Sequence, residues 1–165
     1  VTALLIIIGD YERISDHAVN ILEYAEELRN NNFTLSEDSL KEYEILMGAV
    51  SEVLNLSKNA FKEKSTDLAY KVEPLEQVID ELKEQLRTSQ ILRMKTLESS
   101  TEIGFIWSDL LTNLERVSDH CSNIAGCIID NAKHTLNVHE TLKQVKTDSK
   151  QYFRDYNEFS QKYCL

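Results

Sequence analysis

The stretch that decides the fold is NLERVSDH, residues Asn113–His120, because the chain contains nearly the same phrase twice. The other copy is DYERISDH, residues Asp10–His17, which lies 103 residues earlier. Three residues after each copy comes an asparagine, Asn20 in the first and Asn123 in the second. Self-similarity at a long period indicates a duplicated structural unit. The duplicated residues are mostly polar, whereas a repeat that served core packing alone would preserve apolar positions.

Both copies lie within amphipathic helical patterns. Over Ile106–Ile128, apolar residues recur every three or four positions, which is the period of a helix with one buried face. At about 100° per residue, Glu115 and Asp119 lie about 40° apart and face away from the apolar stripe. Glu12 and Asp16 stand in the same relation in the first copy. Carboxylates at i and i+4 repel each other, so a cation or free solvation must offset the repulsion.

Length and composition predict one helical domain. The 165 residues include four glycines and one proline, too few chain breakers for many turns. The net charge of −10 argues against nucleic acid or anionic lipid as a partner and favours cations. Cys121, Cys127 and Cys164 have no zinc-site spacing, so we interpret them as reduced thiols. The longest apolar run, Ala3–Ile8, is far shorter than the roughly 20 residues of a membrane span.

Local signals predict five long helices with short polar connections. We expect these helices at about residues 1–29, 36–64, 67–95, 99–133 and 137–165. Ser36 can cap the second helix, and Pro74 should kink the third or delay its regular start. Short connections make successive helices antiparallel neighbours. The predicted fold is therefore all-α, an elongated up-and-down antiparallel helical bundle without strands.

Acidic pairs with Glu-x-x-x-Asp spacing are the candidate metal ligands. Glu76 and Asp80 form a third pair, which also faces away from the apolar stripe of its helix. If the third and fourth helices are neighbours, this pair can converge on Glu115 and Asp119. Four carboxylates on facing helices suit Fe(III), Mn, Mg or Ca better than Zn. The alternative is a solvated acidic helix face, which is the commoner meaning of such a pair.

No catalytic residue can be named from the sequence. His17 and His120 are interpreted as structural, and the Glu-x-x-His signature of di-iron proteins is missing from both copies. The sequence contains neither a phosphate-cradling glycine loop nor a nucleophile–base arrangement. A basic patch near the end of the third helix is either solvated or a contact for phosphate or lipid headgroups; it consists of Lys83, Arg87, Arg93 and Lys95.

The doubled phrase resembles the signature of the PhoU family, whose members are two repeats of a three-helix bundle with the signature on each third helix. The resemblance covers about residues 1–133. It implies that 1–29 is the last helix of a truncated first repeat and that 36–133 is the whole second repeat. Residues 137–165 add a C-terminal helix to this single domain. The apolar stripe of the first helix has then lost two neighbours, so the last helix or a second copy of the chain must cover it.

A longer match, Thr101–Cys127, together with the tyrosine-rich last helix, looks more like the cytoplasmic C-terminal domain of bacterial sodium/phosphate cotransporters than like free-standing PhoU. Because a helical pattern is already present at Val1, we expect a segment cut from a longer protein. Its partners would be the upstream transmembrane region of that protein and, in a homodimer, a second copy. The domain would lie at the cytoplasmic face of the membrane.

The resemblance implies regulation of phosphate uptake, with metal clusters on the acidic faces. The ligands carried over by motif position are Glu12, Asp16, Glu76, Asp80, Glu115 and Asp119. We therefore expect a non-enzymatic, metal-binding regulatory domain of a sodium-dependent phosphate transporter. The alternatives are a soluble PhoU-type regulator of phosphate signalling and, from another class, a carboxylate-bridged metalloenzyme such as a phosphatase.

Overall fold

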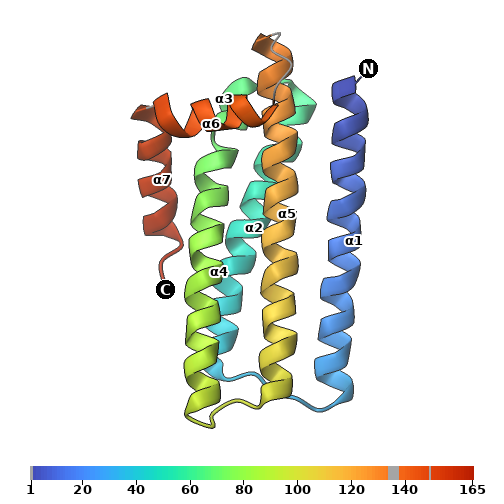
Figure 1. Ribbon diagram of the computed structural model, residues 1–165, viewed down its shortest axis with the longest axis vertical. Helices are drawn as coiled ribbons and strands as arrows, with labels where there is room; N and C mark the ends of the chain where they lie inside the picture. The colour runs from blue at the N-terminus through green and yellow to red at the C-terminus, as the bar shows by residue number, and fades with distance from the viewer. Residues whose placement is uncertain (1, 134–137, 149) are drawn as a thin grey trace.

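The computed structural model describes residues 2–133, 138–148 and 150–165, and within these ranges its regular secondary structure is entirely helical. The helices are α1 (Thr2–Asn30), α2 (Glu37–Glu63), α3 (Thr66–Tyr70), α4 (Val72–Lys95), α5 (Thr101–Lys133), α6 (Val138–Asp148) and α7 (Lys150–Lys162). The four long helices α1, α2, α4 and α5 alternate in direction along the long axis (Figure 1). The predicted all-α, up-and-down fold is confirmed for these parts of the chain.

Polar signals at the helix ends act as the sequence predicts. The Ser36 hydroxyl accepts a hydrogen bond from the Ser39 amide and caps α2. Pro74 lies in the first turn of α4, where backbone N–H groups have no intrahelical partner in any case. The predicted third helix is accordingly divided at Lys71 into the short α3 and the long α4. Pro74 therefore delays the regular start of the helix.

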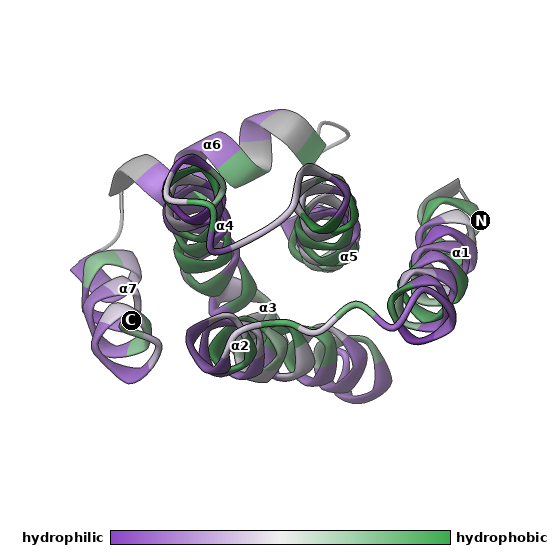
Figure 2. Cartoon of the chain, turned by 90° about the horizontal axis from the view of Figure 1, so that it is seen from below, coloured by the Kyte–Doolittle hydropathy of each residue, from purple (hydrophilic) through white to green (hydrophobic). Residues whose placement is uncertain are grey.

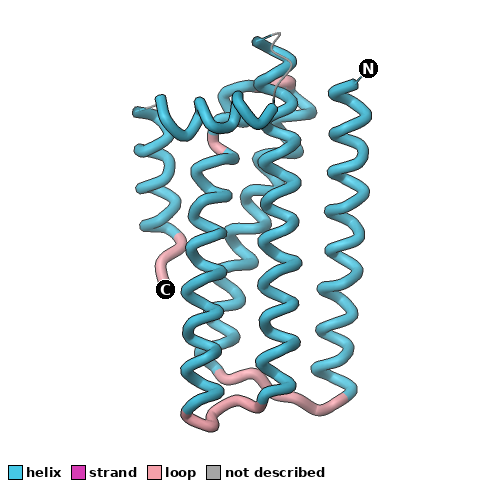
Figure 3. Tube along the Cα trace, in the orientation of Figure 1, coloured by secondary structure: helices cyan, strands magenta, loops and turns pink. Residues whose placement is uncertain are grey.

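The segment 137–165, expected as one helix, contains two. Figure 3 shows α6 crossing one end of the bundle and α7 running back along it. Val145 of α6 is buried near α4 and α5, whereas Tyr152 and Phe159 of α7 are buried on another side of the bundle. Apolar spacing shows which face of a helix is buried but not whether the axis changes direction. Residues 134–137 and 149, including the expected first residue of this helix, lie outside the described residues.

The main core lies between α2, α4 and α5. Leu46, Leu75 and Trp107, one from each helix, are almost completely buried. In the view of Figure 2, α1 lies beside α5 at one side of the bundle and α7 lies at the opposite side. Burial raises the pKa of the Cys121 thiol to about 12 and that of Cys127 to about 11, so both are unreactive core residues. None of the described helices has both the length and the apolar character needed to cross a membrane.

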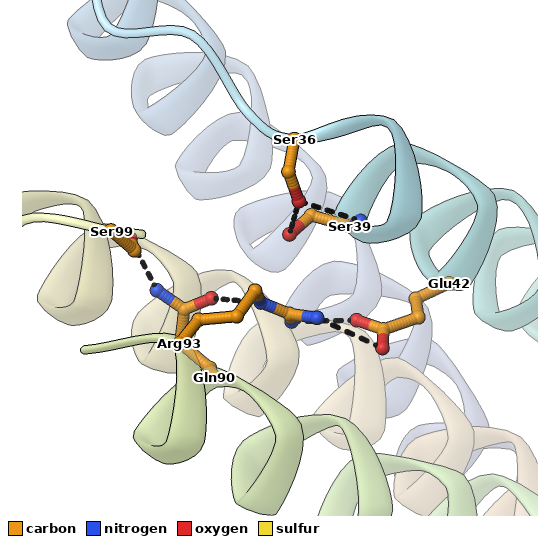
Figure 4. Close-up of polar contacts among 6 residues, drawn as sticks. All are labelled: Ser36, Ser39, Glu42, Gln90, Arg93 and Ser99. Carbon is orange, nitrogen blue, oxygen red and sulfur yellow. Dashed lines mark hydrogen bonds and ion pairs between the residues drawn. The ribbon is translucent and has the colours of Figure 1, made fainter. Parts of the chain in front are cut away.

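A polar network connects α2, α4 and the α4–α5 connection at the end of the bundle opposite α6 (Figure 4). Arg93 of α4 donates hydrogen bonds of 3.1 and 2.7 Å to the two carboxylate oxygens of Glu42 on α2. It also donates to Gln90, whose amide donates to the Ser99 hydroxyl in the α4–α5 connection. Arg93, expected in a solvated or phosphate-binding basic patch, is instead an internal partner of Glu42.

The helix α1 is covered on one face only. Ile7 and Ile14 are buried, and α1 packs mainly on α5. Leu4, Ile8 and Leu22 are each more than half exposed. The helices α6 and α7 pack mainly on α4 and α5, so they do not cover this surface as the first of the two expected routes required. Cover by a second copy of the chain stays a prediction.

Candidate metal centre

Three of the predicted ligands converge between α4 and α5. One carboxylate oxygen each from Glu76, Asp80 and Asp119 lies within 4.8 Å of the other two. Metal–oxygen distances of about 2.0–2.6 Å place ligands of one ion up to about 5 Å apart, so a single cation can reach all three. Glu76 and Asp80 are one turn apart on α4, and Asp119 comes from the neighbouring α5. The expected packing of the third predicted helix against the fourth produces this convergence.

Glu76 is the most buried member of the cluster, with 8% of its surface exposed. Burial, followed by repulsion from the nearby Glu73 carboxylate, raises the pKa of Glu76 to about 8. In the described part of the chain, its Oε2 atom has no hydrogen-bond partner. A buried carboxylate with an unpartnered oxygen must take up a proton or a cation to avoid a large desolvation cost. Glu76 is therefore the member of the cluster whose charged form depends most on a nearby cation.

The fourth predicted ligand on this side, Glu115, lies beside the cluster but is paired with a lysine. The Lys83 Nζ atom is 3.1 Å from Glu115 Oε1, and both side chains are largely buried. Burial and then the charge of Glu115 raise the pKa of both Asp80 and Asp119. Glu115 thus belongs to the cluster electrostatically. Lys83, expected in the basic patch, neutralises part of its charge.

Sequence reasoning missed two charged residues at this site, Glu73 on α4 and Lys146 on α6. The Lys146 Nζ atom lies 3.0 Å from Glu73 Oε1 and 3.5 Å from Glu76 Oε2. Burial opposes the charge of Lys146, but attraction to the two glutamates outweighs it and raises the pKa of the lysine. Glu73 also accepts a hydrogen bond from the Ser122 hydroxyl of α5.

A local signal could have found Glu73 but not Lys146. Glu73 precedes Glu76 by three positions and Asp80 by seven, so all three share one face of a helix. Lys146 is close to them only because α6 crosses the end of the bundle, and no spacing in the sequence reports that crossing.

The first acidic pair does not gather further ligands. Glu12 and Asp16 are exposed on α1. Across residues 2–133, 138–148 and 150–165, the only group of three or more potential ligands is the one between α4 and α5. The reason is that α1 packs mainly on α5, through the face that carries Ile7 and Ile14. The predicted ligand role of Glu12 and Asp16 stays a prediction.

The first and last residues of the repeated phrase connect its two copies. His17 Nδ1 lies 2.8 Å from Asn113 Oδ1, and His120 Nδ1 lies 2.9 Å from Asp10 Oδ1. Asp10 and Asn113 open the two copies and the histidines close them, so the two contacts are reciprocal. The two imidazole rings are stacked, with centroids 5.6 Å apart. These contacts confirm the structural role expected for the histidines and explain their repetition by the pairing of α1 with α5.

The chain matches one domain family and one named relative. The sequence model of the PhoU domain matches residues 44–128, a range that contains every charged residue of the α4–α5 cluster. The chain is 29% identical over 141 residues to the phosphate-specific transport system accessory protein PhoU homolog 1 of Thermotoga maritima. This match covers 86% of the chain but only 60% of the length of that relative. No solved structure matches the chain.

Proposed function

Because this chain belongs to the PhoU family, we propose that it is a non-enzymatic regulatory domain that binds a metal ion through Glu76, Asp80 and Asp119 and acts in phosphate uptake. The observation that carries the metal proposal is the convergence of three carboxylates within 4.8 Å. The buried Oε2 atom of Glu76 supports it independently, because in the described part of the chain this atom has no hydrogen bond. The accessory role in phosphate transport is taken from the printed name of the relative from Thermotoga maritima.

The donor set fits a hard cation. All three donors are carboxylate oxygens, which Fe(III), Mn, Mg and Ca prefer and which suit Zn less well. A bound ion would supply the positive charge that joins the acidic faces of α4 and α5. The chain prepares the site in two ways: Ser122 holds the neighbouring Glu73, and Lys83 neutralises Glu115. A metal bound only by the folded state would also add to stability.

We further propose that the domain works at the cytoplasmic face of the membrane, as part of a sodium/phosphate cotransporter. The support is the resemblance of Thr101–Cys127 to the C-terminal domain of these transporters. A soluble PhoU-type regulator fits the comparisons equally well, since the named relative is an accessory protein. The coding sequence upstream of Val1 separates the two: several apolar runs of about 20 residues would favour the transporter, and their absence the soluble regulator.

Metal analysis of matched double variants tests the metal proposal. Glu76→Gln with Asp80→Asn removes one Glu-x-x-x-Asp pair, and Glu12→Gln with Asp16→Asn removes an equivalent pair from α1. After incubation with Mn²⁺ and dialysis, we expect the wild type and the α1 variant to retain metal and the α4 variant to lose it. Mass spectrometry of the metal content is the readout. Equal retention in all three proteins would contradict the site.

Phosphate uptake tests the regulatory proposal. Cells that express the full-length protein with the α4 double variant should take up phosphate at a changed rate, whereas the α1 double variant should behave like the wild type. Uptake of radiolabelled phosphate measures the rate. The same rate in the α4 variant and the wild type would contradict a regulatory role for this site.

A further inference from the structure

We propose that Lys146 is a tethered competitor for the metal ion: its ammonium group occupies the Glu73–Glu76 end of the acidic cluster, and a metal ion that binds Glu76 displaces it and loosens α6. This inference rests on the proposed metal function. It adds a regulatory contact between the metal centre and α6, a helix outside the segment that matches the PhoU domain.

The contacts of Lys146 satisfy the two glutamates unequally. Its Nζ atom is 3.0 Å from Glu73, a normal hydrogen-bonding distance, and Glu73 has a second partner in Ser122. The distance to Glu76 Oε2 is 3.5 Å, and that oxygen has no hydrogen bond in the described part of the chain. Lys146 therefore places a positive charge beside Glu76 without donating a hydrogen bond to this oxygen. A metal ion would bind that oxygen directly, so exchange of the lysine for the metal gains an interaction.

The two cations cannot share Glu76 without strong repulsion. A metal ion bound to Glu76, Asp80 and Asp119 would lie within a few ångströms of the present Nζ position. Like charges repel at such distances, and the shared ligand Glu76 is almost fully buried, although the Lys146 side chain is 38% exposed. Binding of the metal ion therefore requires Lys146 to move away from Glu76.

The position of α6 depends on a close approach to α5 at Gly126. A Cβ atom at this glycine would lie 2.7 Å from Val138 Cγ1 and 3.1 Å from Leu142 Cγ, both on α6. Figure 1 shows α6 crossing the end of the bundle. Substitution of Gly126 by alanine would therefore require the side chains of Val138 and Leu142 to shift, and α6 with them if they cannot yield. The same change favours the helical backbone of α5, because alanine has the higher helix propensity.

The test measures Mn²⁺ affinity by calorimetry, under nitrogen at pH 8.5, where protons compete less for the carboxylates. Lys146→Met removes the charge and keeps an apolar stem, and Lys150→Met removes an exposed lysine charge from α7 as the control. We expect Lys146→Met to bind Mn²⁺ about tenfold more tightly than the wild type, and Lys150→Met to bind like the wild type. Gly126→Ala keeps every charge and should tighten binding severalfold if it shifts α6 and moves Lys146 away.

The outcomes separate this inference from the proposed function. If the wild type binds Mn²⁺ and Lys146→Met binds it equally or more weakly, the competition is overturned and the metal function stands. Binding by Lys146→Met alone would support the competition in its strongest form. No binding by any variant would overturn both. Hydrogen exchange gives a second readout: Mn²⁺ should speed amide exchange in α6 of the wild type, and slower exchange there would contradict displacement.

Discussion

The helices α5 and α1 carry the same phrase, but only α5 is enclosed by other helices. At the repeat distance of 103 residues, Leu111 of α5 corresponds to Ile8 of α1, and their exposed fractions are 1% and 54%. Trp107 corresponds in the same way to Leu4, with exposed fractions of 1% and 51%. By contrast, the equivalent residues Asp10 and Asn113, which pair the two helices with each other, are both buried. The difference shows that neighbouring helices, and not the phrase itself, decide which surface is core.

The acidic faces of the two helices differ for the same reason. Asp119 of α5 has Glu76 and Asp80 opposite it on α4, so its carboxylate belongs to a cluster. Asp16 occupies the equivalent position on α1 and is exposed. Affinity for a hard cation grows with the number of convergent oxygen ligands. One phrase therefore produces a candidate metal site on α5 and a solvated acidic face on α1.

The largest expected difference in stability is between substitutions at the equivalent apolar positions Leu111 and Ile8. Leu111→Ala should lower the free energy of unfolding by about 3 kcal/mol, because it leaves a cavity in the core. Ile8→Ala should change it by no more than about 0.5 kcal/mol, since the side chain is exposed. Urea denaturation measures both. A large cost for Ile8→Ala that depends on protein concentration would show instead that a second copy covers α1, as the predicted homodimer requires.

The next largest effect on stability is expected from removing the two reciprocal histidine contacts. His120→Ala should cost about 2–3 kcal/mol, because it leaves the carboxylate of Asp10 buried and unpaired. His17→Ala should cost about 1 kcal/mol, since Asn113 keeps a 3.0 Å hydrogen bond from Asn20. Chemical denaturation of both variants in the same buffer tests the order. Equal costs would mean that the charge of Asp10 adds nothing to the contact.

The pH dependence of stability should distinguish the two acidic faces. Between about pH 4.5 and 8 the folded protein holds a proton on Glu76 that the unfolded chain has released, because the pKa of Glu76 is raised to about 8. Without metal, stability should therefore fall as the pH rises through this range, by about 1 kcal/mol per pH unit. Denaturation in chelator from pH 5.5 to 8 measures the slope. Glu76→Gln should flatten it and Asp16→Asn, the control on α1, should not; an unchanged slope in Glu76→Gln would contradict the assignment.

Helical periodicity was sufficient to predict the bundle and the convergence of Glu76, Asp80 and Asp119, because a helix fixes which side chains share a face. It could not predict contacts that depend on how distant elements cross. The 3–4 spacing of residues 137–165 is the same whether the segment is one helix or two, so it did not reveal that α6 and α7 run in different directions. Lys146 reaches the cluster because α6 crosses the end of the bundle and lies close to α5 at Gly126.

The central claim is that the acidic face of α5, and not that of α1, binds the metal ion. Calorimetric titration with Mn²⁺ of the wild type, Asp119→Ala and Asp16→Ala tests it most directly. We predict that Asp16→Ala binds like the wild type and that Asp119→Ala binds at least about tenfold more weakly, a loss of about 1.4 kcal/mol. Equal losses in the two variants would contradict the claim. An absence of binding in the wild type would make both faces ordinary solvated acidic surfaces.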